Sequence, residues 1–418
     1  MGFKKTHFPA FMIAILIIVS VGFVNLTQIL FQKDLYYTNK NWLSSDYMAF
    51  YNASQRMMRG ESPYSITRYL QPPTVASMNY YILAHLDRDT VKRVVFSLVL
   101  ISVFSTYILI TQVFFKTEEE EIKYILLYGS IIILFSFPFY FLIDRGHIDG
   151  FVILSLCLGI VFLNKNDYFA GFFFGLAISM KIYPVLVLAP LFIFRKKKAF
   201  IVTIITLLVL ILFCPHLWLE FLQEKLLVRA TMGGIYFGWG ENGSIANTFL
   251  WFAIFINKIS SFFGLKGVNV SYFIITSFIV YFIMFLIMIV ADYKIFKKYN
   301  TLDYGTEISS IMMYFPFMVA VPKVAFQYEL VILFPLVPML CFLWQKHNNP
   351  MSQKIVLLFI IGIAMSQIQA VALQKLFNPK YQLPHFFPGF GLFLVMISCI
   401  VYKFWLYKEM SHKPVHRE

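Results

Sequence analysis

The sequence predicts an all-α polytopic membrane protein, and three observations support this prediction. Hydrophobic residues make up 59% of the 418 residues and charged residues only 13%, whereas a soluble domain carries about 25% charged residues. The mean hydropathy is +0.72, and several apolar runs are long enough to cross a bilayer as a helix. Basic residues gather in short clusters between these runs. The net charge of +14 therefore indicates an anionic lipid surface and not nucleic acid as the partner.

The first apolar run, residues 8–31, sets the orientation of the chain. It is too long for the core of a signal peptide and lacks a small-residue cleavage site, so we expect a retained helix. Lys4 and Lys5 precede it, and the positive-inside rule therefore places the N-terminus in the cytoplasm. Residues 33–92 then form a first external loop with short amphipathic helices. This loop contains a polar stretch with one aspartate, Asp46.

The later apolar runs alternate between the two sides of the membrane. They lie at residues 94–115, 124–143, 150–163, 168–181, 182–194, 199–214, 271–291, 307–321, 330–344, 354–372 and 386–406. We expect a single domain over residues 1–418 with about twelve spans, and with both termini and the basic clusters in the cytoplasm. The hydrophobic stretch 246–270 must begin and end outside in this topology, so we expect an interfacial or re-entrant helix there.

Two other patterns have structural interpretations. The cysteines Cys157, Cys214, Cys341 and Cys399 lie in or at the ends of apolar runs without Cys-x-x-Cys spacing, which predicts reduced packing residues. Asp87 and Asp89 match the Asp-x-Asp metal motif of nucleotide-sugar enzymes, but they precede a predicted helix. There they complement the positive end of the helix dipole. The sequence therefore predicts neither a metal nor a cofactor.

Single acids and bases gather on the predicted outer side, near glycines, prolines and aromatic residues. An ionisable group at membrane depth costs about 2.5–3.5 kcal/mol on insertion scales, so a lysine between two apolar runs, such as Lys181, needs an explanation. Structural alternatives remain for each group. Asp46 can cap a helix, and Lys181 can extend to the interface. The residues of the "DRGHID" segment, Arg145, His147 and Asp149, can simply end or begin helices.

Outward acids and cations at the rim of a bilayer suit glycosyl transfer from a lipid-linked sugar. A positioned aspartate can remove the proton of the acceptor hydroxyl, and such general base catalysis contributes about 10²–10⁴-fold. The leaving phosphate gains negative charge, which Lys and Arg stabilise best where water is excluded. A carrier or flippase for lipid-linked sugars and an O-antigen-type polymerase are alternatives. A carrier favours paired repeats with broken helices, and a polymerase is expected to rely on external arginines, which are sparse here.

Two segments resemble glycosyltransferase family 87. "DYMAFYNASQRMMRGESPY" followed by "YLQPPTVA" is similar to the first external loop of that family, and "GHIDGFVILSL" through "SMKIYPVLVLAPLFIFRKKK" is similar to its Gly-Gln-x-Asn and Lys-x-x-Pro segments. "ENGSIANTFL" resembles the Asn-Gln-Ser segment. The matching positions are Asp46, Tyr47, Ala53, Gly60, Pro63, Tyr64, Pro72, Pro73, Gly146, Gly171, Gly175, Lys181, Pro184 and Asn242.

The chain departs from the family pattern at three places. His147 stands where the family usually has Gln, and Asp149 where it has Asn. The late Ser-Trp-x-His-His motif is reduced to "PKVAFQYE", so that its histidines correspond at best to Gln327 and Tyr328. If a histidine of that motif contacts the donor phosphate, this chain must use another group there, such as Lys323.

The resemblance implies a membrane-embedded enzyme of the GT-C class that moves a hexose, with mannose as the implied sugar, from a polyprenyl-phosphate donor. It implies an inverting reaction on a lipid-linked or glycan acceptor, in the plasma (inner) membrane with the site on the extracytoplasmic side. Asp46 is the expected base, and Lys181, Arg145 and Lys323 are the expected ligands of the donor phosphate. The expected substrate-binding residues are Tyr47, His147, Asp149, Asn242, Gln327, Tyr328 and Glu329.

Overall fold

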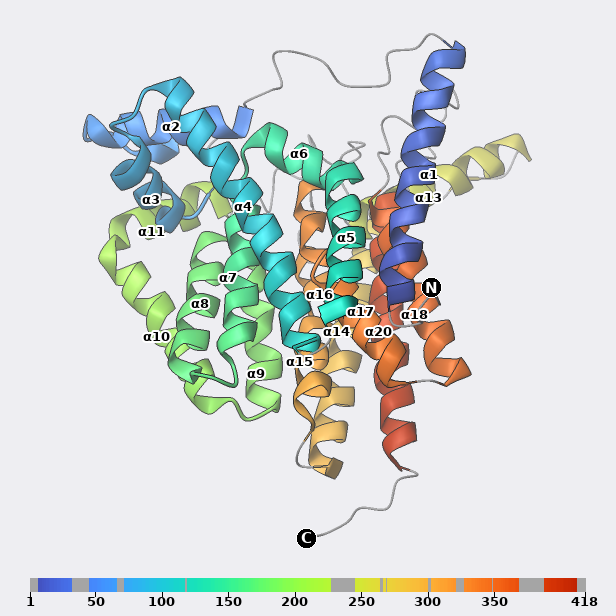
Figure 1. Cartoon of the computed structure of the whole chain (residues 1–418). Coiled ribbons are helices and arrows are strands. Elements are labelled where there is room, and N and C mark those ends of the chain that lie inside the picture. Colours follow the sequence, from blue (N-terminus) through green and yellow to red (C-terminus); the bar gives the residue numbers. More distant parts are fainter. Residues whose placement is uncertain are drawn as a thin grey trace.

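The computed structural model describes most of the chain, and every regular element in the described part is a helix (Figure 1). The all-α class predicted from the sequence is therefore confirmed for these residues. They are residues 7–31, 45–65, 71–116, 119–226, 245–263, 266–267, 269–299, 302–320, 327–347, 349–367 and 387–411.

Four described helical segments are long and apolar enough to cross a membrane: Arg88–Phe114, Ile275–Tyr299, Glu329–Lys346 and Pro388–Met410. The number rises to six if two bent helix pairs each count as one span. The predicted count of about twelve spans stays a prediction, since the remaining apolar helices are shorter. These are Phe8–Gly22, Asp149–Phe162, Asp167–Met180, Tyr183–Ile193, Thr248–Phe262 and Pro350–Ser366.

Proline explains both bends. Helix α5 (Glu119–Phe135) turns by 65° into α6 (Phe137–Arg145), and α10 (Lys197–Phe213) turns by 98° at α11 (Pro215–Glu220). A proline lies in the first turn after each break, where its missing N–H costs no helical hydrogen bond but prevents the previous helix from continuing. Both bends lie at the end of the bundle opposite the C-terminal end of α20 (Phe387–Ser411) (Figure 1).

Close helix packing holds the first half of the bundle together. Helix α8 (Asp167–Met180) packs against α7 (Asp149–Phe162) and α10, and α7 also packs against α4 (Arg88–Phe114). A Cβ atom at Gly171 would lie 2.6 Å from the carbonyl oxygen of Ala199, and one at Gly175 would lie 2.9 Å from that of Thr203. The α8 and α10 backbones therefore approach as closely as small residues permit in membrane helices.

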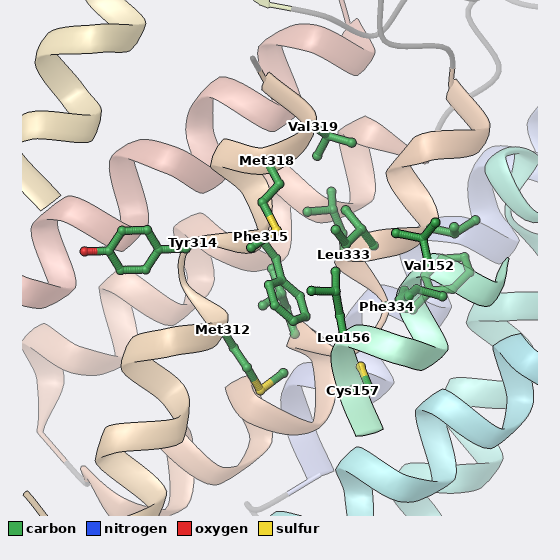
Figure 2. Packing of buried hydrophobic residues seen from close by; sticks show 14 of the residues in the cluster. Val152, Leu156, Cys157, Met312, Tyr314, Phe315, Met318, Val319, Leu333 and Phe334 are labelled. Carbon is green, nitrogen blue, oxygen red and sulfur yellow. The ribbon is translucent and has the colours of Figure 1, made fainter. Parts of the chain in front are cut away.

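The second half of the bundle is packed around short helices. The element η5 (Gln327–Leu333) contacts α6, α7 and α16 (Phe315–Ala320), and it leads towards α17 (Leu336–Lys346). Figure 2 shows Phe315, Met318, Leu333 and Phe334 beside Val152 and Leu156 of α7, and all six side chains are buried. This apolar contact fixes η5, which also carries Glu329.

The other helices enclose these elements. Helices α1 (Phe8–Phe31) and α5 pack together, and α18 (Pro350–Ser366) packs against α20 (Phe387–Ser411). The shorter elements are η3 (Tyr183–Val187), α9 (Leu188–Ile193), η4 (Phe221–Leu226) and α15 (Tyr304–Met312). Helix α13 (Ile245–Phe262) covers most of the stretch for which an interfacial helix is predicted, and it runs at an angle to the bundle (Figure 1). Its place in the membrane remains a prediction.

Two helices and one short turn form a unit between α1 and α4, which we call the cap: α2 (Ser45–Met58), η2 (Pro63–Ser65) and α3 (Pro73–Leu83). The cap lies at the end of the bundle opposite the C-terminal end of α20 (Figure 1). One side of it is attached to the α11 region, because Ser62 donates a hydrogen bond to Glu220 and the ring of Tyr64 lies 5.8 Å from that of Phe221.

A buried ion pair joins α20 to α14 (Val270–Tyr299). Lys403 Nζ donates to Asp292 Oδ1 at 2.5 Å, and the hydroxyl of Tyr314 donates to the second oxygen, Oδ2, at 2.9 Å. All three side chains are buried. Each oxygen of the Asp292 carboxylate accepts one hydrogen bond, from Lys403 or from Tyr314. We therefore interpret these three residues as a structural contact.

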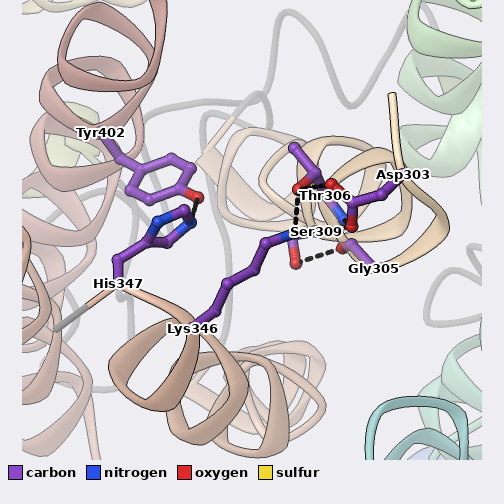
Figure 3. A network of polar contacts seen from close by, with 7 residues as sticks. All are labelled: Asp303, Gly305, Thr306, Ser309, Lys346, His347 and Tyr402. Carbon is purple, nitrogen blue, oxygen red and sulfur yellow. Dashed lines mark hydrogen bonds and ion pairs between the residues drawn. The ribbon is translucent and has the colours of Figure 1, made fainter. Parts of the chain in front are cut away.

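A second polar network, shown in Figure 3, joins α15, α17 and α20 at the bundle end opposite the cap (Figure 1). Lys346 Nζ donates to Asp303 Oδ1 at 2.6 Å and to the Thr306 hydroxyl at 2.7 Å, which joins the end of α17 to the start of α15. Partial burial raises the pKa of Asp303, but the hydrogen bonds from Lys346 and Thr306 lower it more, and the pKa is below its usual range. His347 and Tyr402 form a further contact at 3.2 Å.

The structure also shows what the Asp87–Asp89 pair and the four cysteines contact. Asp87 Oδ1 accepts hydrogen bonds from the backbone N–H groups of Asp89 and Thr90, both at 3.0 Å, so it caps α4 as predicted. Within the described part of the chain, no cluster of His, Cys, Asp and Glu could hold a metal ion. The four cysteines are free and buried, which confirms their interpretation as packing residues.

The α8–α10 contact can be tested with two glycines. Gly171→Ala should lower the free energy of unfolding by about 1–3 kcal/mol, because the added methyl group meets the Ala199 carbonyl. Gly22→Ala is the matched control, since nothing lies within 4 Å of its Cβ position in α1. Thermal unfolding of both variants in detergent measures the difference, and equal melting temperatures would contradict the packing argument.

Candidate functional site

Four residues predicted to belong to the site converge in space from distant parts of the chain. We call them the ionic cluster: His147, Asp149, Lys181 and Glu329. They come from the junction of α6 and α7, the end of α8 and η5. Lys181 is 6% exposed and each of the other three is 1% exposed. The sequence named all four residues as site candidates without indicating that they contact one another, and their role in a site remains a prediction.

The α6–α7 junction places two members of the cluster. Gly146 ends α6 in the left-handed conformation, with φ at 57°, and its N–H bonds back to the carbonyls of Leu142 and Ile143. Glycine adopts this conformation without the steric cost that a Cβ atom adds. Asp149 then becomes the first residue of α7, where a carboxylate complements the helix dipole. Its position as a helix start is thus compatible with its ionic contacts.

Lys181 follows the last residue of α8 in an extended conformation. Its Nζ lies 3.4 Å from Glu329 Oε1 and 3.8 Å from Asp149 Oδ1. The side chain is buried between two carboxylates, so it does not extend to the interface as the structural alternative proposed. Each buried charge is expensive in apolar surroundings and is tolerated because opposite charges lie beside it.

Asp149 is the centre of the cluster. Its Oδ2 lies 2.6 Å from His147 Nδ1, and its Oδ1 accepts a hydrogen bond from the Tyr183 hydroxyl at 2.9 Å. Tyr183 was not predicted as a site residue. The signal was present in the Lys-Ile-Tyr-Pro sequence, where Tyr183 lies two residues after Lys181, but only the tertiary structure shows that its hydroxyl meets Asp149.

The cap contacts the ionic cluster through His147. Gln71 Nε2 lies 3.2 Å from His147 Nε2, and the rings of Phe50 and His147 lie 6.1 Å apart. Phe50 belongs to α2, four residues after Asp46, and thus about one helical turn from it. The structure describes the backbone of Asp46 and Tyr47 as part of α2, while their side chains lie outside the described part.

The other predicted site residues are distributed as follows. Arg145, in the last turn of α6, is buried, and its guanidinium lies over the Phe141 ring at 5.0 Å from the centroid. Gln327 and Tyr328 belong to η5 by their backbone, but their side chains lie outside the described part. Lys323 and Asn242 lie entirely outside the described residues.

A comparison with protein families identifies the chain. The model of glycosyltransferase family 87 matches residues 69–291, which is more than half of the 418 residues. The chain belongs to glycosyltransferase family 87. The matched segment of this family 87 protein contains Gln71, His147, Asp149 and Lys181, whereas Asp46 precedes it and Glu329 follows it.

A comparison with individual proteins gives a more distant relative. The chain is 27% identical over 160 residues to GPI mannosyltransferase 1 of Saccharomyces cerevisiae. This match covers 37% of the chain and 37% of the relative. The family 87 protein therefore spans little more than a third of the relative's length, and the name of that relative describes the relative alone.

The ionic cluster makes Lys181 important for folding. Lys181→Met should lower the free energy of unfolding by about 3–5 kcal/mol, because two buried carboxylates lose their cation. Adding Glu329→Gln should restore part of the loss. Lys346→Met is the matched control: its ion pair with Asp303 is partly exposed, so it should cost less than about 1 kcal/mol. Chemical denaturation of the variants in detergent gives the comparison, and an equal effect of the Lys181 and Lys346 changes would refute the argument.

Proposed function

We propose that this protein is an inverting membrane glycosyltransferase. It transfers mannose, which is a hexose, from a polyprenyl-phosphate donor to a lipid-linked or glycan acceptor. Family 87 membership supports the reaction class, and the name of the yeast relative supports the sugar. The observation that carries the proposal is the buried lysine Lys181, whose cluster is contacted by the same cap that contains Asp46.

The donor phosphate is assigned to the cations of the cluster and its surroundings. Lys181, Arg145 and Lys323 are the proposed ligands. Burial of Lys181 and Arg145 supports this role, because a cation in a water-excluded site stabilises the charge that develops on the leaving phosphate more strongly than one in water. A phosphate that approaches Lys181 competes with Asp149 and Glu329 for the ammonium group, and contacts of 3.4 and 3.8 Å are long enough to be exchanged.

Asp46 is proposed as the base. It removes the proton of the acceptor hydroxyl as the hydroxyl oxygen attacks the anomeric carbon, and the carbon–oxygen bond to the phosphate breaks with its electron pair remaining on the phosphate. One carboxylate suffices for this inverting displacement, whereas retention through a covalent intermediate requires a second carboxylate about 5 Å away. The residues proposed to bind the sugar and the acceptor are Tyr47, Asp149, Asn242, Gln327, Tyr328 and Glu329. His147, whose two ring nitrogens face Asp149 and Gln71, is proposed to act through those contacts.

We propose that the cap faces the extracytoplasmic side of the plasma (inner) membrane and that both termini are cytoplasmic. The basic residues support this orientation, since Lys297 and Lys298 end α14 and Lys408 lies in the last turn of α20. The cap and the C-terminal end of α20 lie at opposite ends of the bundle (Figure 1). In this proposal the shorter apolar helices other than α13, together with α15 and α16 as one span, supply the remaining spans, for a total of about twelve.

Asp46→Asn tests the proposed base. The amide keeps the shape of the carboxylate but cannot accept the proton, so turnover should fall by about 10²-fold or more while expression and donor binding stay nearly unchanged. Asp46→Glu should be partly active at best, since the added methylene displaces the base. The measurement is single-turnover transfer from polyprenyl-phosphate mannose in nanodiscs, with thermal stability in parallel. Near-normal transfer by a folded Asn variant would return Asp46 to the role of a helix cap.

The orientation can be measured independently of activity. Single cysteines at position 46 and at position 196, introduced into a chain without its four native cysteines, should react with a membrane-impermeant maleimide from opposite sides. Position 46 should be labelled in intact cells, and position 196 only after permeabilisation. Labelling of position 46 from the cytoplasm alone would overturn the proposal, because the lipid-linked sugar would be presented on the wrong side.

A further inference from the structure

We propose that His147 is a positioning residue that holds the cap in register with the ionic cluster, and hence sets the position of Asp46 relative to Lys181. This inference rests on the proposed function, because it assigns a purpose to the distance between the base and the cation. Each ring nitrogen of His147 contacts a different part of the molecule, and the ring is 1% exposed.

The Nδ1 nitrogen of His147 faces the helix bundle. His147 Nδ1 lies 2.6 Å from Asp149 Oδ2, and the other oxygen of that carboxylate contacts Tyr183 at 2.9 Å and Lys181 at 3.8 Å. The carboxylate is thus held at both oxygens. Since a carboxylate accepts and does not donate, Nδ1 carries the proton of the imidazole in this contact, and the orientation of the ring is fixed by Asp149.

The Nε2 nitrogen of His147 faces the cap. Gln71 Nε2 lies 3.2 Å from His147 Nε2, and when the imidazole is neutral with its proton on Nδ1, the amide N–H of Gln71 donates to Nε2. Gln71 is 8% exposed, directly precedes the two prolines that start α3, and its own carbonyl accepts a hydrogen bond from Tyr64 at 3.2 Å. The amide oxygen Oε1 of Gln71 has no hydrogen-bond partner in the described part of the chain, so the amide is oriented through its nitrogen.

The two contacts make a continuous polar path from the cap to Lys181, through Gln71, His147 and Asp149. Phe50 of α2 adds an apolar contact to the same ring, at a centroid distance of 6.1 Å. On its other side the cap is held by Ser62 on Glu220 and by Tyr64 on Phe221. Other contacts of the cap include those of α3 with α8 and of α2 with α4, and the polar contact through His147 leads to the ionic cluster.

Reaction rates depend steeply on how accurately the reacting groups are positioned. A misplacement of about 1 Å at the reacting groups can cost about 10²-fold in rate. If His147 sets the distance between Asp46 and Lys181, its loss should lower kcat while the donor KM, which reports the phosphate ligands, changes little. A residue with a merely structural role would instead lower the amount of folded enzyme and leave the kcat of the folded fraction unchanged.

Two amide variants of His147 test the contacts of its two ring nitrogens one at a time. The Asn amide is as many bonds from Cβ as Nδ1, so His147→Asn can still donate to Asp149 but cannot reach Gln71. The Gln amide is as many bonds from Cβ as Nε2, so His147→Gln can still contact Gln71. We expect His147→Asn to lower kcat by about tenfold or more with an almost unchanged donor KM. We expect His147→Gln to keep more of kcat but to raise the donor KM, since Asp149 loses a partner beside Lys181.

A double-mutant cycle decides whether Gln71 and His147 act as one contact. Gln71→Leu should lower kcat as much as His147→Asn does, and the double variant should be no worse than either single variant. Ser62→Ala is the matched control in another cap attachment, and its effect should multiply with that of His147→Asn. The readout is release of polyprenyl phosphate from a short-chain polyprenyl-phosphate mannose in nanodiscs, normalised to the folded fraction.

The outcomes distinguish this inference from the proposed function. If Asp46→Asn and Lys181→Ala are inactive while the folded His147→Asn variant has normal kcat, the positioning role is wrong and the function stands. Multiplying effects of His147→Asn and Gln71→Leu would also overturn it. If His147→Asn does not fold, Gln71→Leu alone decides, and a normal kcat for that variant refutes the proposal. If Asp46→Asn and Lys181→Ala are both active, the proposed function itself fails.

Discussion

Lys181 can keep its charge among apolar helices only because Asp149 and Glu329 lie beside it, and much of the described architecture follows from that constraint. The two carboxylates come from α7 and η5, so both elements must reach the end of α8. The α6–α7 turn at Gly146 supplies Asp149, and the apolar packing of η5 against α16 and α7 supplies Glu329. Ionic and apolar contacts thus support the same arrangement of helices.

The comparison with Lys403 and Asp292 shows what distinguishes the ionic cluster from a structural ion pair. Lys403 lies 2.5 Å from its carboxylate, and both side chains are completely buried. Lys181 instead lies 3.4 and 3.8 Å from two carboxylates, at the bundle end beside the cap. A short contact between two helices stabilises one state, whereas longer contacts to two acids can be exchanged for a new anion at a lower cost in free energy. This difference supports the assignment of a ligand to Lys181 and not to Lys403.

The helical class could be predicted from the sequence, because it depends on local signals, whereas the external position of the cap and the functional role of the ionic cluster remain predictions. Apolar runs report helices, and an isolated lysine between two such runs reports a group that must be paired. The contacts of Tyr183 and Gln71 could not be predicted, since they depend on how residues far apart in the chain meet. The bends at α6 and α11 were also missed, although a proline marks each, because proline alone does not fix the direction of the next helix. The number of spans, the side of the membrane and the role of Asp46 remain predictions.

The central claim is that the donor phosphate binds beside Lys181, at the bundle end that carries the cap. A cryo-electron microscopy structure in nanodiscs with polyprenyl phosphate, the leaving group of the proposed reaction, tests it most directly. We expect a phosphate oxygen about 2.7–3.2 Å from Lys181 Nζ, with the Lys181–Glu329 contact lengthened and the Asp46 carboxylate facing the same space. A phosphate bound elsewhere, for example at the opposite end beside Lys346, with the Lys181 contacts unchanged, would contradict it.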